Sequence, residues 1–206
     1  MKRLLGLFAL LTAIALGISS CASVAMTFED LSRSWKGIPA TMSTYDKEGH
    51  ILDSVKGKSF QFALDERFEE VSRDSDGGII RTPGSVLLLT VGKSHVSHVG
   101  SSLLLAEDGL TPAVDAATTV NVDSTEPGVP WLNNLIEYHR NMWKGKSKTL
   151  MIRSQDDKPI AVYAAHEVEI QGTAVPQSTM FRIDGKRLLA YRVSYTIYDT
   201  DMLNEQ

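Results

Sequence analysis

Hydrophobic and polar residues alternate over many short segments of the chain, which is the pattern of strands with one buried face. Turn signals such as the Asp184-Gly185 pair separate several of these segments and favour antiparallel hairpins. The pattern predicts strands at residues 40–45, 51–55, 59–64, 85–91, 96–99, 101–106, 149–153, 160–164, 167–170, 179–183 and 186–198. The chain is therefore expected to be rich in antiparallel β-sheet.

A helical pattern occurs near the start of this region. Thr27 is a suitable N-cap, and acidic residues follow it in what would be the first turn. Phe28, Leu31 and Trp35 then share one face of a short helix over residues 27–36. We expect this apolar face to pack on the domain.

A second, amphipathic helix is predicted near residues 130–144. Pro130 suits its first turn, apolar residues recur at helical spacing, and Gly145 is a natural residue for its end. In residues 110–128, which precede this helix, hydrophobic residues recur with no clear period. These residues therefore predict a long connection at which two halves of the domain would join. The polar residues 65–78 predict a surface loop. The expected fold class is α+β, predominantly antiparallel β-sheet.

The first twenty residues have the composition of an export signal. Two basic residues precede an uncharged apolar run over residues 4–18, and small residues follow it. The run is shorter than the roughly 20 residues that span a bilayer. We expect residues 1–20 to be removed, residues 21–26 to form a short tether, and residues 27–206 to form a single β-rich extracytoplasmic domain.

The single cysteine of the chain lies directly after this leader. Ile18-Ser19-Ser20-Cys21 resembles the bacterial lipobox, in which a branched aliphatic residue and two small residues precede an invariant cysteine. The resemblance implies cleavage before Cys21, a diacylglycerol joined to its sulfur, and usually a further acyl chain, such as palmitate, on the new α-amine. Cys21 is therefore the predicted lipidation site, and the extracytoplasmic face of the cell membrane is the predicted location. Since one cysteine cannot form an internal disulfide, the domain must be stabilised by its core.

The charge of the chain narrows the range of partners. The formal net charge is −4, and removal of the leader would make it more negative by two. Proteins that bind nucleic acid usually present a basic face, so no nucleic-acid partner is expected. The same charge disfavours electrostatic docking on anionic lipid. The lipid on the cysteine is then the expected contact with the membrane.

The sequence contains fragments of motifs for catalysis, nucleotide binding and metal binding, but their residue spacing does not match any of these motifs. Three Gly-Lys-Ser triples, at Gly57, Gly92 and Gly145, lack the second glycine that a P-loop places five residues earlier. His95 and His98 lie in a predicted strand, where residues three apart face opposite sides. No serine-hydrolase elbow occurs. We therefore predict no catalytic, cofactor-binding or metal-binding residue and no cofactor.

Three longer segments resemble a known family. They are HVGSSLLLAEDGL at residues 98–110, GKSKTLMIRSQDDKPIAVY at residues 145–163 and MFRIDGKRLLAYRVSYTIYDTDML at residues 180–203. They are similar to small Gram-positive lipoproteins grouped as a numbered family of domains of unknown function. The similarity runs from the lipobox to Leu203 and is weakest over residues 65–83. It implies a shared location and fold and brings no catalytic motif.

These observations favour a non-catalytic binding or assembly module of the bacterial cell envelope, with an unknown protein or glycan partner. One alternative is a cell-envelope hydrolase, which would need two converging carboxylates. Another is a solute-binding lipoprotein, which would need two α/β lobes. Several aromatic residues could line a glycan or peptide groove or, as we expect, pack in the core: Trp131, Tyr138, Trp143, Tyr191, Tyr195 and Tyr198.

Overall fold

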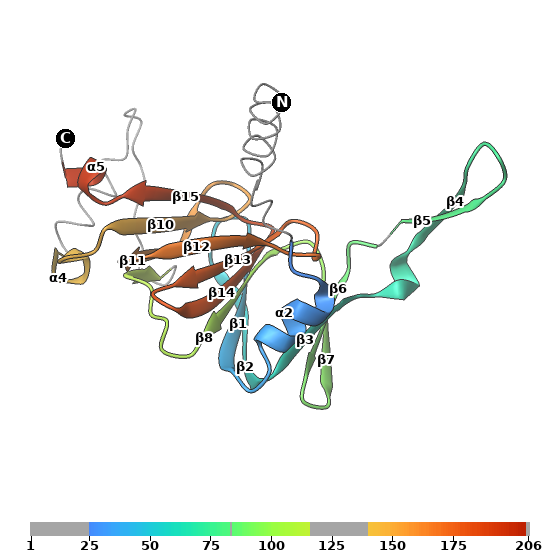
Figure 1. Cartoon of the computed structure of the whole chain (residues 1–206), viewed down its shortest axis with the longest axis horizontal. Coiled ribbons are helices and arrows are strands. Elements are labelled where there is room, and N and C mark those ends of the chain that lie inside the picture. The colour runs from blue at the N-terminus through green and yellow to red at the C-terminus, as the bar shows by residue number, and fades with distance from the viewer. Residues whose placement is uncertain (1–24, 83, 116–139, 205–206) are drawn as a thin grey trace, which may run out of the picture.

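A computed structural model describes residues 25–82, 84–115 and 140–204, which form mostly antiparallel strands with few helices (Figure 1). The helices are α2 (Phe28–Ser34), the 3-10 helix η1 (Glu66–Phe68), α4 (Arg140–Trp143) and α5 (Asp201–Asn204). The strands are β1 (Pro39–Tyr45), β2 (Ile51–Lys58), β3 (Phe60–Leu64), β4 (Glu70–Arg73), β5 (Ile79–Thr82), β6 (Leu87–Val91), β7 (Ser94–His98), β8 (Ser102–Glu107), β9 (Val114–Asp115), β10 (Lys148–Arg153), β11 (Pro159–Ala165), β12 (Val168–Gly172), β13 (Ser178–Ile183), β14 (Lys186–Tyr191) and β15 (Ser194–Asp199).

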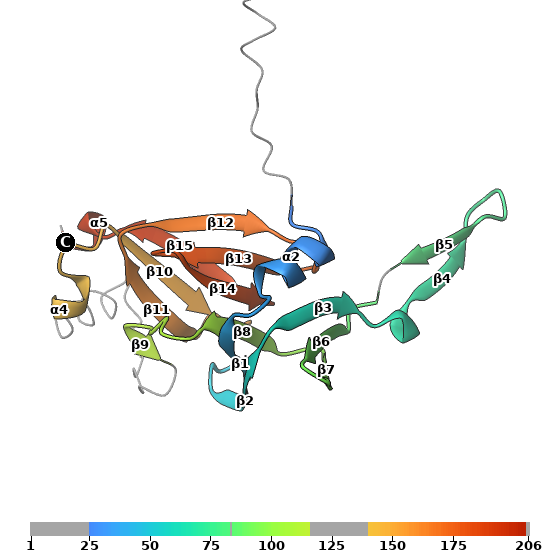
Figure 2. The same cartoon turned by 60° about the horizontal axis from the view of Figure 1, so that its bottom comes forward.

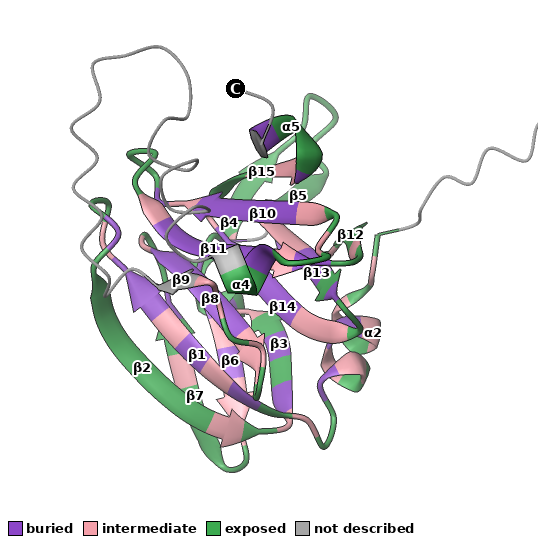
Figure 3. Cartoon of the chain, turned by 90° about the vertical axis from the view of Figure 1, so that its left-hand side faces the viewer, coloured by how far each residue is buried: buried purple, intermediate pink, exposed green. Residues whose placement is uncertain are grey.

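A six-stranded antiparallel sheet forms the centre of the described structure, in the order β12-β13-β14-β8-β1-β2. Its strand β8 carries three consecutive buried leucines, Leu103, Leu104 and Leu105. Because successive strand residues face opposite sides, both faces of the sheet must be covered. The edge strand β2 is instead exposed along nearly its whole length (Figure 3).

One face of this sheet packs against α2 and a three-stranded sheet of order β3-β6-β7 (Figure 2). The strand predicted at residues 85–91 is therefore the central strand of the small sheet. The buried residues of this layer come mainly from the six-stranded sheet, α2 and the three-stranded sheet. They are Leu31, Trp35, Ala40, Met42, Phe60, Phe62, Leu87, Leu89, Leu103, Leu105, Val175, Met180, Leu189 and Tyr191.

The other face packs against a four-stranded sheet of order β15-β10-β11-β9. This second layer contains Tyr45, Leu104, Leu150, Ile152, Ile160, Ala161, Tyr163, Ala165, Phe181, Ile183, Leu188 and Ala190. On the outer side of the four-stranded sheet, Trp143 at the end of α4 and Leu203 of α5 cover Met151 and Val162. The described chain thus stacks three sheets around two apolar layers.

The predicted helix at residues 27–36 is confirmed as α2. The Thr27 hydroxyl accepts a hydrogen bond from the Asp30 N–H at 3.1 Å, and Leu31 and Trp35 are fully buried. Of the helix predicted at residues 130–144, the structure describes α4, whereas residues 130–139 lie outside the described residues. The described chain is therefore mostly antiparallel β-sheet, with little helix to support a balanced α+β description.

The segment predicted as one strand over residues 186–198 is two strands in different sheets. β14 belongs to the six-stranded sheet and β15 to the four-stranded sheet. Arg192, which lies between them, has a φ of 53°, in the left-handed region that non-glycine residues rarely adopt. This residue ends the pairing of β14 and redirects the chain across the sandwich.

In two places, predicted strands that follow each other in the sequence do not pair. β3 does not continue the hairpin of β1 and β2 but pairs with β6, after Ser59 turns the chain with a φ of 65°. β8 does not pair with β7 but lies between β1 and β14. Strands from before and after the predicted connection at residues 110–128 therefore share one sheet, while residues 116–128 lie outside the described residues.

Asp184, in the turn between β13 and β14, ties this turn to the corner between β11 and β12. Its Oδ1 accepts hydrogen bonds from the N–H groups of His166 at 2.8 Å and Glu167 at 3.0 Å, and its Oδ2 accepts one from Lys146 Nζ at 2.6 Å. Burial opposes ionisation, but the bonds from Lys146 and the two N–H groups outweigh it and lower the pKa of Asp184.

Asp184→Asn is expected to lower the free energy of unfolding at pH 7 by on the order of 1 kcal/mol, because an uncharged amide replaces a charged acceptor. A lowered folded-state pKa contributes stability above about pH 4 that is lost as the pH falls through the folded-state value. Urea unfolding should therefore show the difference between wild type and variant shrinking below about pH 4. A difference that stays constant down to about pH 2 would contradict this account, and Asp156→Asn, at an exposed 3.8 Å ion pair, is the control.

Candidate functional site

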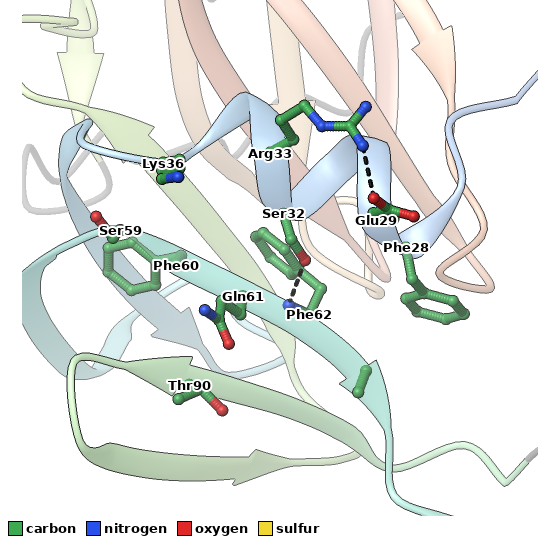
Figure 4. Close-up of a pocket in the computed structure, with 11 residues that line it drawn as sticks. Phe28, Glu29, Ser32, Arg33, Lys36, Ser59, Phe60, Gln61, Phe62 and Thr90 are labelled. Atoms are coloured by element: carbon green, nitrogen blue, oxygen red, sulfur yellow. Dashed lines mark hydrogen bonds and ion pairs between the residues drawn. The ribbon is translucent and has the colours of Figure 1, made fainter.

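A groove of about 590 Å³ runs between α2 and β3 (Figure 4). The helix buries Leu31 and Trp35, and the side of the helix next to this buried face, with Phe28, Ser32 and Lys36, lines the groove. Strand alternation buries Phe60 and Phe62 of β3 and leaves Gln61 and Ala63 on the outer face. The α2–β3 groove is lined by Phe28, Glu29, Ser32, Arg33, Lys36, Ser59, Phe60, Gln61, Phe62, Ala63 and Thr90.

Hydrogen bonds fix the two walls of the groove to each other. The Phe62 N–H donates to Ser32 Oγ at 3.0 Å, and the Gly37 N–H donates to Ser59 Oγ at 2.8 Å. The Ser59 N–H in turn donates to the Ile38 carbonyl at 3.2 Å. These bonds satisfy the backbone donors of Gly37, Ser59 and Phe62 and join the two walls, so the groove is a pre-formed feature.

Charge within the groove is unevenly distributed. Arg33 pairs with Glu29 at 2.6 Å and with Asp30 at 3.1 Å, so its charge is largely balanced. The hydrogen bond from Thr27 is the main cause of a lowered pKa of Asp30. Lys36 has no ion pair or hydrogen bond from its ammonium group within the described ranges, and it stands beside Ser59 at one end (Figure 4). Partly apolar walls with few charges fit a polypeptide or a sugar chain.

β3 continues beyond the groove into a projecting hairpin that the sequence did not predict. Residues 65–78, expected to be a loop, contain η1, β4 and the turn that leads to β5. Figures 1 and 2 both show this hairpin extending away from the packed sheets. We call residues 65–82 the arm. Among the described elements, β4 and β5 contact each other extensively and no other element to a similar degree.

The turn and the base of the arm are built by local hydrogen bonds. At the turn, Asp74 Oδ1 accepts from the N–H groups of Asp76 at 3.0 Å and Gly78 at 2.6 Å. At the base, the buried Asp65 accepts from Arg67 Nε at 2.9 Å and Nη2 at 2.6 Å, which lowers the pKa of Asp65. The Asp65 N–H donates to the carbonyl of Val86 and attaches the arm to the three-stranded sheet.

The arm exposes apolar side chains on both of its faces. Val71 and Ile79, each 61% exposed, lie on the same face as Arg73 and Arg81, because Val71 pairs with Arg81 and Arg73 with Ile79. Ile80, which pairs with Ser72, lies on the other face, and Phe68 is exposed at the base. Two-stranded hairpins are marginally stable in water by themselves, so these exposed residues indicate a surface suited to a partner.

The structure separates the residues that the sequence singled out. Cys21 lies outside the described residues. His95 and His98 face opposite sides, as predicted: His95 is exposed and bonds Thr90, whereas His98 is buried and bonds the Ser101 carbonyl at 3.0 Å. Among the described residues no group of three or more His, Cys, Asp or Glu side chains is close enough to hold a metal ion.

The four aromatic residues named from the sequence that the structure describes do not line the groove. Trp143 and Tyr191 are buried, Tyr198 packs on the outer cluster, and Tyr195 stacks edge-on against Phe181 with ring centroids 4.8 Å apart. Trp131 and Tyr138 lie outside the described residues. The groove instead uses Phe28, which stands where β3 ends (Figure 4). In the sequence, the alternation of Phe60, Gln61, Phe62 and Ala63 was the available signal for the strand that forms one wall of this groove.

The fold and these surfaces define a layered antiparallel β module with a groove and a projecting arm. The chain belongs to the family described as a domain of unknown function (DUF5052), whose sequence profile matches residues 2–203. No curated protein and no solved structure matches the chain. Within the described ranges, no helix combines the length and the hydropathy needed to cross a membrane.

Proposed function

We propose that this protein is a bacterial lipoprotein, held on the extracytoplasmic face of the cell membrane by lipid on Cys21, and that it is a non-catalytic binding or assembly module of the cell envelope. The lipobox resemblance at Ile18-Ser19-Ser20-Cys21 and the apolar leader before it support the location. The similarity to Gram-positive lipoproteins supports the same location.

The observation that carries the binding function is the arm, with its exposed apolar residues. Among the described strands, each strand of the arm has one partner and therefore one free edge, and a free strand edge can pair with a strand of another protein. The arm continues directly from β3, so the α2–β3 groove, whose lining reaches Ala63, adjoins the base of the arm at Asp65. An extended polypeptide could lie in the groove and pair with the arm.

The charge of the arm indicates what this partner presents. Residues 65–82 contain six acidic and three basic side chains, so the arm carries a net negative charge. Arg67 and Arg81 are already paired, with Asp65 at 2.6 Å and Glu69 at 3.2 Å. The partner is therefore a protein with an unpaired strand edge, apolar side chains and a basic surface.

The hydrolase alternative receives less support from the groove. Among the described residues Glu29 is the one carboxylate that lines it, and Arg33 holds its Oε1 at 2.6 Å. A glycosidase mechanism needs a second acid about 5–9.5 Å away across the substrate. The solute-binding alternative needs two α/β lobes, and the described residues form stacked antiparallel sheets instead.

Photo-cross-linking on native cells tests the proposal. A photoreactive residue placed at Val71 of the arm and, separately, at Gln61 of the groove should capture the same basic protein, whereas one at the exposed Glu169 of β12 should not. Phe68→Ser combined with Ile79→Ser should lower the capture at Val71 at least ten-fold, because the variant removes two exposed apolar contacts.

The matched control is Met202→Ser on α5, which changes an equally exposed apolar residue, 61% exposed like Ile79. This variant should leave capture unchanged. Equal capture at Val71 and Glu169, or different proteins at Val71 and Gln61, would rule out the arm and groove as one recognition surface. Urea unfolding of each variant shows whether the fold is intact.

A further inference from the structure

A second hollow, of about 450 Å³, lies where three turns of the sandwich meet. The turn between β10 and β11 contributes Gln155, the segment before β13 contributes Gln177, and the turn between β14 and β15 contributes Arg192. It shares no lining residue with the α2–β3 groove. We call it the turn pocket.

Hydrogen bonds between the turns hold this pocket in shape. The Arg192 N–H donates to the Gln177 carbonyl at 2.9 Å, and the Arg192 carbonyl accepts from Ser102 Oγ at 2.7 Å. Gln155 Nε2 donates to the Gly100 carbonyl at 2.6 Å, and Ser194 Oγ donates to Asp157 Oδ1 at 2.8 Å. Turns that are far apart in the sequence are therefore fixed relative to one another.

Backbone strain is concentrated at this place. Five non-glycine residues in the described ranges have a positive φ, and three of them border or line the pocket: Asp157 at 56°, Gln177 at 58° and Arg192 at 53°. Such conformations persist only where the surrounding structure enforces them, and they cluster at functional sites. Here they bring the side chains of Gln177 and Arg192 to the same pocket.

The described lining of the pocket combines one positive charge with neutral polar groups. Besides Arg192, the polar residues that line the pocket are serine, threonine and glutamine, and no carboxylate lines it in the described part of the chain. Within the same part, the Arg192 guanidinium, the Gln177 amide and the Thr179 hydroxyl have no hydrogen-bond or ion-pair partner. Arg192 is partly buried and lines the hollow together with these hydroxyl and amide groups, and the carboxylate of Asp157 at the border accepts a hydrogen bond from the Ser194 hydroxyl.

We propose that the turn pocket binds an oxyanion, a carboxylate or a phosphate, carried on a hydroxylated chain such as a sugar acid or a polyol phosphate. A planar guanidinium matches the two oxygens of such an anion, and the hydroxyl and amide groups around it match hydroxyl groups of the ligand. No aromatic ring from the described segments lines the pocket, so the face of a neutral sugar would have none of these rings to stack on. This site is independent of the arm and extends the proposed function to a small ligand.

Ligand-observed NMR on the full chain in a mild detergent tests the assignment with four probes: glycerol 3-phosphate, glucuronate, inorganic phosphate and glucose. Glycerol 3-phosphate or glucuronate, or both, should bind at millimolar concentrations, and glucose should not. Tighter binding of glycerol 3-phosphate would identify the oxyanion as a phosphate, and tighter binding of glucuronate would identify it as a carboxylate. If inorganic phosphate binds equally well, the proposal that the pocket recognises hydroxyl groups of the ligand is wrong. Binding of glucose alone, or of no probe, would overturn the whole proposal.

Arg192→Gln should weaken binding of the preferred probe at least ten-fold, because it removes the charge and keeps a non-glycine residue at this backbone conformation. Arg192→Lys should weaken it less, since it retains the charge without the planar geometry. Arg182→Gln, at an exposed ion pair 3.6 Å from Glu169 outside the pocket, is the matched control and should change nothing. Unchanged affinity of a folded Arg192→Gln variant, verified by its thermal unfolding, would refute the site.

Discussion

Leu105→Ala is expected to lower the free energy of unfolding by about 2–5 kcal/mol. Leu105 is 0% exposed and lies in the central strand β8, where it pairs with Met42 of β1 on one side and Leu189 of β14 on the other. Its side chain packs in the layer formed with α2 and the three-stranded sheet. Truncation there removes apolar contacts and leaves a cavity that neighbours on two strands cannot fill.

Leu52→Ala is the matched control, since Leu52 is 55% exposed on the edge strand β2. The same chemical change should alter stability by no more than about 0.5 kcal/mol there. Urea unfolding followed by the fluorescence of the buried Trp35 and Trp143 measures both variants. A folded protein of this size is stable by roughly 5–15 kcal/mol, so the core variant should shift the midpoint strongly. Equal midpoints for the two variants would show that β8 is not the centre of the sheet.

The parts of the fold that the sequence predicted correctly are those set by local signals. α2 follows from the Thr27 cap and the spacing of Leu31 and Trp35 along one helix face. The hairpin of β13 and β14 follows from Asp184-Gly185, two residues that readily adopt a positive φ. Such signals act within a few residues, so they can be read without knowing which sheet a strand joins.

The choice of sheet could not be predicted, because strand alternation looks the same in every sheet. The alternation of residues 186–198 continues through Arg192 without interruption, although β14 and β15 belong to two different, neighbouring sheets. The break is a backbone conformation at one residue, and arginine gives no sign of it in the sequence. Consecutive apolar residues, such as the leucines of β8, were the available sign of a strand buried on both faces.

The candidate surfaces were missed for the same physical reason. The α2–β3 groove requires α2 to lie beside the outer face of β3, and the turn pocket requires three distant turns to meet. The arm was predicted as a loop because acidic residues and glycines dominate residues 65–78. The short apolar pairs at Val71 and at Ile79-Ile80, on either side of the Asp74 turn, were the signal for its strands.

The distance between the proposed anchor and the described body follows from the chain itself. The described structure is attached at Met26, whose N–H donates to the Gly172 carbonyl at 2.9 Å and whose carbonyl accepts from the Ala174 N–H at 2.7 Å. Met26 is five residue steps from Cys21 along the chain, and an extended chain spans at most ~3.6 Å per residue. Lipid on Cys21 would therefore hold the end of β12 within about 18 Å of the membrane surface.

Cys21→Ser is expected to abolish lipidation completely, because the thiolate is the nucleophile that accepts the diacylglycerol and a serine hydroxyl is far less reactive. Mass spectrometry of the N-terminal peptide from native cells is the decisive measurement. In the wild-type protein this peptide should begin at residue 21 and carry at least two acyl chains, which suffice for stable anchoring at about 0.8 kcal/mol per buried methylene. The variant should carry none.

Fractionation alone would be ambiguous for this variant, since an uncleaved leader could retain the chain at the membrane through its own apolar run. The mass of the peptide separates the two cases, because a retained leader adds residues 1–20 and lipidation adds acyl chains. Ala22→Ser, which changes the neighbouring residue and keeps the thiol, should be processed and lipidated like the wild type. An unmodified Cys21 in the wild-type peptide would show that the proposed lipid anchor does not exist. The arm and the groove would then have to find their partner without being confined to a membrane surface, where a tethered module meets envelope components at a raised effective concentration.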